Sequence, residues 1–176
     1  MIFTPTAVAG AFIIDVQQRQ DERGYFARLW CERELAQQGL STRIAQANVA
    51  VSIKAGTLRG MHLQREPYAE VKIMRCQRGA LYDVVVDLRP QSPSYLKWVG
   101  VELNELNGRM LYAPEGCAHG YLTLRDDTEL AYSTSQFYEM DAAYGVRYDD
   151  PALNIQWPAA TRVISEQDRR WPLLAR

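Results

Sequence analysis

The stretch "VKIMRCQRGALYDVVVDLRP" (71–90) sets the fold class of this chain. Apolar and polar residues alternate on either side of Gly79, and Pro90 closes the run. Alternation with period two is typical of β-strands, and a glycine between two such runs indicates a turn. The stretch therefore predicts two strands joined at Gly79.

The residues that follow repeat this pattern. Short β-forming runs, "KWVGVEL" (97–103), "RMLYAP" (109–114), "GYLTL" (120–124) and "TELAYSTSQFY" (128–138), are separated by Gly, Pro, Asn and Asp. Such spacing is typical of a β-sandwich or small barrel. Only "CERELAQQGL" (31–40), stopped by Gly39, has helical periodicity, and the tail has room for a short helix. We expect one mainly β domain over residues 1–176.

The overall composition excludes several classes of protein. The net charge is −1 and the apolar fraction is 47%, so nothing attracts the chain generally to nucleic acid or to a membrane. No apolar run is long enough for a membrane helix, and the first residues lack a secretory signal. The three cysteines have no CxxC spacing, which predicts reduced, partly buried thiols and a cytoplasmic protein.

The two histidines of the chain lie in similar surroundings. His62 stands in "TLRGMHLQ" (57–64) and His119 in "YAPEGCAHGYLTL" (112–124), each beside apolar β-forming residues. Strict alternation would place Arg59, Met61 and Leu63 on one face of the first strand and His62 on the other. A sandwich of this size can enclose a pocket lined by alternate side chains. By the same alternation, one polar row carries Glu70 and Lys72, and another carries Tyr132, Thr134, Gln136 and Tyr138.

These motifs resemble a known family. "GTLRGMHLQ" (56–64) and "NGRMLYAPEGCAHG" (107–120) are similar to the two signature segments of a cupin jelly roll. More narrowly, the chain resembles the dTDP-4-dehydrorhamnose 3,5-epimerases over nearly its whole length. The resemblance is carried by "DERGYF" (21–26), "TLRGMHLQ" (57–64), "DVVVDLRPQSPSYLKWVGVEL" (83–103), "LYAPEGCAHGYLTL" (111–124), "YDDPALNIQWP" (148–158) and "ISEQD" (164–168).

The resemblance implies a cupin-type jelly roll with a few short helices and an enzyme without cofactor or metal. Such an enzyme inverts C3, C5 or both of a nucleotide-linked 4-keto-6-deoxyhexose, in rhamnose-like deoxysugar biosynthesis. The reaction needs a base on one face of the sugar, a cation or donor at the ketone oxygen, and an acid on the other face. The family also implies a homodimer, and exposed sheet edges favour one.

Residue roles are implied by the same resemblance. His62 matches the base, Asp168 its carboxylate partner, Lys72 the cation at the ketone oxygen, and Tyr132 the acid. The remaining matches are to substrate-binding positions: Arg23 (supplied by the neighbouring subunit), Gln46, Asn48, Arg59, His119 (with Asp83) and Tyr138.

Each residue also has a purely structural interpretation. His62 and His119 can be packed histidines, Lys72 an ordinary strand lysine, and the tyrosines part of the core. Asp168 can be a turn or helix-cap residue, and Arg59 can pair with an acidic neighbour.

Two rival functions remain open at this stage. Many cupins bind a metal, and His62, Glu70 and His119 would supply two imidazoles and a carboxylate for an iron-dependent dioxygenase or isomerase. A non-catalytic sugar-nucleotide binding protein on the same fold is the other.

Four positions depart from the family pattern: Arg28, Ala47, Ala143 and Gln167. They leave the proton-transfer residues intact but put the identity of the nucleotide and sugar in question.

Overall fold

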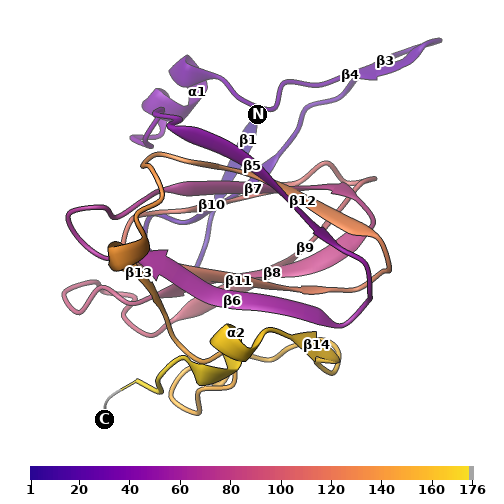
Figure 1. Cartoon of the computed structure of the whole chain (residues 1–176). Helices are drawn as coiled ribbons and strands as arrows, with labels where there is room; N and C mark the ends of the chain where they lie inside the picture. Colours follow the sequence, from indigo (N-terminus) through magenta and orange to yellow (C-terminus); the bar gives the residue numbers. More distant parts are fainter. Residues whose placement is uncertain (175–176) are drawn as a thin grey trace.

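The computed structural model of the chain describes residues 1–174, which form two antiparallel sheets that face each other (Figure 1). The first sheet has the order β1 (Ile2–Pro5), β2 (Phe12–Asp15), β10 (Met110–Ala113), β7 (Lys72–Arg78), β12 (Thr128–Thr134) and β5 (Gln46–Ser52). The second has the order β13 (Ala143–Gly145), β6 (Thr57–Gln64), β11 (Cys117–Thr123), β8 (Ala80–Asp87) and β9 (Trp98–Asn104), and β14 (Val163–Ile164) pairs in parallel with β6. The expected mainly β jelly roll is confirmed.

Gly79 carries the chain from one sheet to the other. It lies between β7 and β8, as predicted, but these two strands belong to different sheets. Its φ of +76° is in the left-handed region, which glycine adopts without strain. The inward-facing residues of β7 and the inward-facing residues of β8 therefore lie on opposite walls of the interior.

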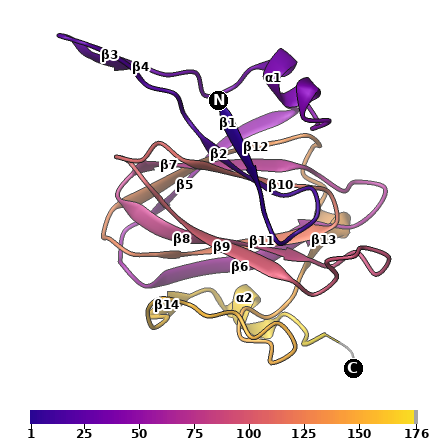
Figure 2. The same cartoon turned by 180° about the vertical axis from the view of Figure 1, so that it is seen from behind.

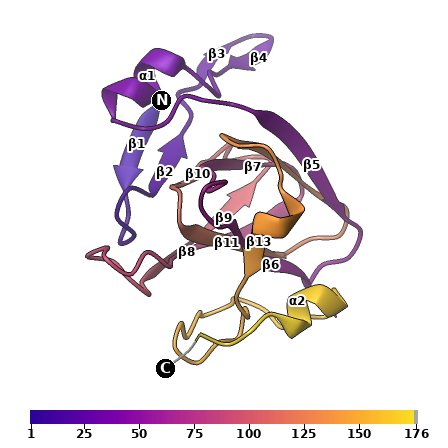
Figure 3. The same cartoon turned by 60° about the vertical axis from the view of Figure 1, so that its left-hand side comes forward.

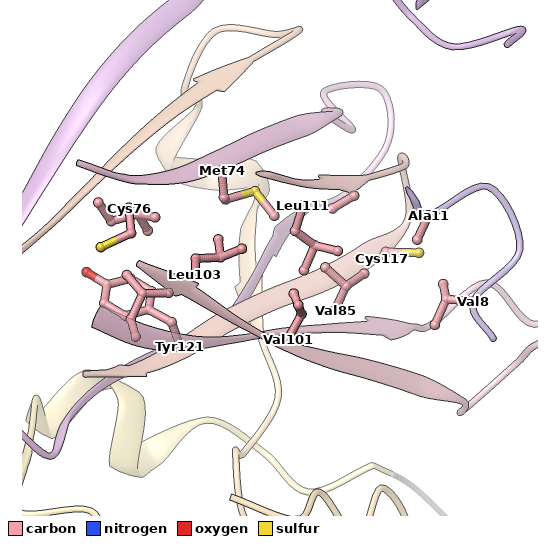
Figure 4. Close-up of a cluster of buried hydrophobic side chains, with 13 residues drawn as sticks. Val8, Ala11, Met74, Cys76, Val85, Val101, Leu103, Leu111, Cys117 and Tyr121 are labelled. Atoms are coloured by element: carbon pink, nitrogen blue, oxygen red, sulfur yellow. The ribbon is translucent and has the colours of Figure 1, made fainter. Parts of the chain in front are cut away.

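The space between the sheets is filled at one end by an apolar cluster (Figure 4). Met74 and Leu111 point into it from the first sheet, and Val85 and Leu103 from the second. All four are fully buried, and each such side chain contributes about 1.5–3 kcal/mol of transfer free energy. The other end of this space is left for polar side chains.

The segment after β13 covers the outer face of the second sheet. There Val84 and Val86 pack with Met61, Val146 and Leu153, while Val85 points inward. Both faces of β8 are thus buried, which explains its continuous apolar run. Figures 1 and 2 show β14 and the helix α2 (Glu166–Arg170) lying beneath β6.

The remaining elements are small. The predicted helix is α1 (Glu32–Gln37), followed by Gly39 with a φ of +70°, and the predicted short helix of the tail is α2. A 3₁₀ turn, η1, spans Met140–Ala142. The hairpin β3 (Arg19–Asp21) and β4 (Gly24–Phe26) projects away from the sheets (Figures 1 and 2). Among residues 1–174, no helix is long and apolar enough to cross a membrane.

Candidate active site

A cavity of about 780 Å³ opens between the two sheets at their polar end. Figure 3 looks along the space between the sheets, with β13 and α2 in front. Nearly all of the predicted site residues line the cavity: Gln46, Asn48, Arg59, His62, Lys72, His119, Tyr132, Tyr138 and Asp168. The exception is Arg23, which lies at the tip of the projecting hairpin, exposed and paired with Asp21.

His62 and Asp168 form a hydrogen-bonded pair at the cavity wall. The Nε2 atom of His62 lies 2.6 Å from Oδ1 of Asp168. The histidine side chain is 40% exposed toward the cavity, whereas that of Asp168 is 6% exposed. Burial alone would raise the pKa of Asp168, but hydrogen bonds from His62, the Gly60 amide and Trp171 hold it below its usual value. The carboxylate therefore stays ionised and can stabilise an imidazolium.

The chain brings these two residues together through its C-terminal segment. Val163 and Ile164 pair in parallel with Thr57 and Leu58, which places the start of α2 beside β6. The Ser165 side chain then accepts a hydrogen bond from the Asp168 amide and caps the helix. Asp168 is thus inside the first turn, with its carboxylate turned toward His62.

Lys72 lies on β7, in the opposite sheet. Its Nζ atom is 3.0 Å from Oε1 of Glu70 and 3.2 Å from the backbone oxygen of His62. An ammonium group has three N–H bonds, so two acceptors leave one for a ligand in the cavity. The position of Lys72 fits a cation held ready for an oxygen that gains negative charge.

Tyr132 lies on β12, next to β7, in the sheet that faces His62. Burial raises the pKa of its phenol, and the nearby Arg59 only partly opposes this shift. The phenol is therefore protonated at neutral pH and can act as a proton donor. Tyr132, Thr134, Gln136 and Tyr138 all line the cavity, as their alternation predicts, although the last two lie beyond the end of β12.

His119 forms a second pair, with Asp83 on the neighbouring strand β8. The Nε2 atom of His119 lies 2.5 Å from Oδ1 of Asp83, whose side chain is fully buried. The side chain of His119 is only 9% exposed. The His119–Asp83 pair closes the cavity next to His62, which is the Cα partner of His119 where β11 pairs with β6.

The alternation predicted for "TLRGMHLQ" is wrong at one position. Arg59 lines the cavity together with His62, and its guanidinium donates to the Val51 oxygen at 3.1 Å and to the Ser52 hydroxyl at 3.4 Å. Met61 packs on the opposite face of the sheet. The register between β6 and β11 shifts between His119 and Tyr121, and the additional residue in β6 turns Arg59 inward.

The geometry does not favour the alternative metal site. Among residues 1–174, no three His, Cys, Asp or Glu side chains are grouped as metal ligands. Each proposed ligand already has a partner: His62 meets Asp168, Glu70 meets Lys72 and His119 meets Asp83. The ammonium of Lys72, 3.0 Å from the Glu70 carboxylate, would also repel a metal cation.

Two of the four departures from the family pattern lie at the cavity and two do not. Ala143 and Gln167 line it. Arg28 instead pairs with Glu34 of α1. Ala47 is exposed on the face of β5 that points away from the cavity.

Sequence reasoning missed Trp171 and Tyr144, which also line the cavity. Both lie outside the long alternating runs: Trp171 follows α2, and Tyr144 is in a strand of three residues. Local pattern gives no signal for such positions.

Comparison with known proteins places this geometry in a family. The family model described as dTDP-4-dehydrorhamnose 3,5-epimerase matches residues 5–176. The chain belongs to this family. A dTDP-4-dehydrorhamnose 3,5-epimerase of Sinorhizobium fredii is 41% identical over 99% of this chain and 90% of its own. A dTDP-4-dehydrorhamnose 3-epimerase of Streptomyces niveus is 38% identical over 99% of this chain and 84% of its own.

A solved structure agrees with these sequence relatives. The crystal structure of the dTDP-4-dehydrorhamnose 3,5-epimerase of Bacillus anthracis, with TDP and PPi bound, superimposes with a TM-score of 0.94 at 36% identity. It covers 98% of this chain and 99% of its own. The predicted family is thus confirmed.

Proposed function

We propose that the protein is a cofactor-independent epimerase that inverts C3, C5 or both of a nucleotide-linked 4-keto-6-deoxyhexose, in deoxysugar biosynthesis. The observation that carries the proposal is the arrangement of three side chains around one cavity. His62, held by Asp168, is on one sheet, and Lys72 and Tyr132 are on the facing sheet. This is the set that proton removal and return beside a ketone require.

His62 acts as the base. It removes the proton from a carbon next to the ketone, and the electron pair moves onto the ketone oxygen to form an enolate. Asp168 accepts a hydrogen bond from the imidazole, fixes its tautomer and stabilises the imidazolium. The free N–H of Lys72 stabilises the negative oxygen.

Tyr132 acts as the acid. Its phenol donates a proton to the same carbon from the other side of the sugar, because it projects from the sheet opposite His62. Proton return to the opposite face inverts the stereocentre, and the enolate collapses back to the ketone. The raised pKa of Tyr132 keeps the proton available until the enolate is present.

The nucleotide end of the substrate is bound by a second group of residues. Arg59 supplies a guanidinium for the pyrophosphate, and Gln46, Asn48 and Tyr138 line the same cavity. The TDP bound to the Bacillus relative supports a thymidine nucleotide here. Ala143 and Gln167 are the positions at which the choice of sugar or base would differ.

A homodimer completes the site. On the outward face of the edge strand β5 and just beyond it, Ala47, Val49, Val51 and Ile53 are exposed, and an apolar row on an edge strand favours pairing with a second copy. The projecting hairpin would then carry Arg23 to the partner's cavity. Light scattering at micromolar concentration should give the mass of a dimer; a monomer would contradict this part of the proposal.

Two coarser features go with this function. We take residues 1–176 as one folding unit, because strands from the first and last parts of the chain share the two sheets. The cytoplasm is the compartment that suits its free thiols, of which Cys76 and Cys117 are buried.

The experiment is incubation with a panel of 4-keto-6-deoxy sugar nucleotides in heavy water. We expect deuterium to enter at C3, C5 or both with one member of the panel, and its position reports the stereocentre. No uptake from any member would contradict the proposed function.

A further inference from the structure

Trp171, the residue that directly follows α2, contacts both members of the His62–Asp168 pair. Its indole Nε1 donates to Oδ1 of Asp168 at 3.1 Å, the same oxygen that lies 2.6 Å from Nε2 of His62. Its ring lies edge-on to the imidazole, with the centroids 6.2 Å apart and the planes at 69°. One side chain therefore contacts the carboxylate and also bounds the imidazole.

The indole is held in place by β13. Its ring packs edge-on against the Tyr144 ring, with the centroids 6.0 Å apart. The guanidinium of Arg65 lies 3.7 Å from the centroid of the same Tyr144 ring. The neighbouring Gly145 has no side chain, and a Cβ atom there would overlap the indole. Because Gly145 is the Cα partner of His62 in the sheet, the indole and the imidazole are positioned by the same pair of strands.

The shared oxygen has an electrostatic consequence. A carboxylate that accepts a hydrogen bond from an indole has less negative charge to offer its other partner. The bond from Trp171 is one of those that lower the pKa of Asp168 against the opposing effect of burial. Trp171 thus limits how strongly Asp168 stabilises the protonated imidazole.

We propose that Trp171 is a positioning residue for the base: it fixes the Asp168 carboxylate and the imidazole plane, and it weakens the hold of Asp168 on a proton carried by His62. The catalytic part of this proposal rests on the proposed function. The effect on the imidazole itself does not, because it concerns only the free protein.

The test follows the two histidines by NMR in protein with ¹⁵N-labelled imidazoles. The chain has only two, so the His62→Gln variant assigns both signals. In Trp171→Phe an aromatic ring remains but the donor is lost. We expect the titration midpoint of His62 to move upward relative to the wild type, because the Asp168 carboxylate then keeps more of its negative charge for the imidazolium.

Two further variants sharpen the result. Trp157→Phe is the matched control, because Trp157 donates to the Tyr148 backbone oxygen and lies away from the cavity. It should leave the His62 midpoint unchanged. Gly145→Ala displaces the indole without altering it and should move the midpoint in the same direction as Trp171→Phe. His119, which pairs with Asp83, is an internal reference and should not move in any of the three.

The kinetic counterpart is the dependence of kcat/KM on pH. In Trp171→Phe its acid limb should shift upward with the NMR midpoint, and kcat should fall about fivefold with KM within twofold, as expected for lost orientation. An unchanged His62 midpoint in Trp171→Phe, or equal shifts of both histidines, would overturn the proposal. If wild-type protein turns over no keto-sugar while the NMR shift is seen, the proposed function fails and the positioning role stands.

Discussion

The second sheet carries two histidine–aspartate pairs side by side, and they differ in what surrounds them. His119 and Asp83 lie on neighbouring strands and are almost completely buried. His62 obtains its aspartate from a helix 106 residues further along the chain and keeps its ring open to the cavity. The same two residue types therefore form a buried wall in one place and, in the proposed function, an accessible proton carrier in the other. The two pairs differ in the exposure of the imidazole ring, and we expect this exposure to decide which of them can carry a proton.

Replacing each histidine in turn tests the difference between the two pairs most directly. We expect His62→Ala to lose about 10²–10⁴-fold in turnover, the usual contribution of a general base. His119→Ala should lose about tenfold, because the base remains and only the wall is disturbed. Steady-state kinetics on the keto-sugar nucleotide, with deuterium uptake followed in parallel, measure both. Equal losses in the two variants would remove the distinction.

Tyr132→Phe tests the opposite wall. We expect inversion to fall by about 10²–10⁴-fold, because the ring keeps its place but the phenolic proton donor is lost. Tyr121→Phe is the matched control, since its phenol also lines the cavity and is buried. Undiminished inversion and exchange in Tyr132→Phe would remove Tyr132 from its assigned role.

The two aspartates should respond in different measurements. Asp168→Asn keeps the shape of the side chain but weakens support for the imidazolium, so we expect turnover to fall about 10²-fold with folding largely preserved. Asp83→Asn alters a pair whose aspartate is fully buried, so we expect a loss of about 3 kcal/mol in the free energy of unfolding. Urea denaturation and kinetics on both variants separate these outcomes. A large loss of folding stability in Asp168→Asn together with a large loss of turnover in a stably folded Asp83→Asn would contradict the account.

The smallest expected effect is on folding stability at acidic pH. The pKa of Asp168 is lower in the folded protein than its usual value of 3.8, so its ionised form contributes stability at neutral pH. This contribution is fully present above that value and is lost as the pH falls below it through the folded pKa. We expect urea midpoints to fall less between pH 5 and pH 3 in Asp168→Asn than in the wild type. An identical fall in both proteins would contradict this.

Local sequence pattern predicts much of this molecule. The alternation around Gly79 and in the later runs locates β7 to β12, and the helical spacing before Gly39 locates α1. Within "TELAYSTSQFY", the polar row Tyr132, Thr134, Gln136 and Tyr138 reaches the cavity, as its alternation predicts. The family resemblance places His62 and Asp168 together, which periodicity alone does not.

The remaining features depend on contacts that local pattern does not encode. The face of Arg59 is set by a register shift against β11, which is a property of two strands and not of one. The short hairpin β3–β4 gives too few residues for an alternation to be recognised. Trp171 acquires its contact with Asp168 only when the C-terminal segment folds beneath β6.

The most direct test of the central claim is a crystal structure with a nucleotide-linked 6-deoxyglucose, which lacks the ketone and cannot react. We predict that the His62 imidazole and the Tyr132 oxygen lie on opposite faces of the pyranose ring, each about 3–3.5 Å from it, with Lys72 at the oxygen on C4. A sugar held with both groups on one face, or with its C4 oxygen at His119 instead of Lys72, would contradict the account.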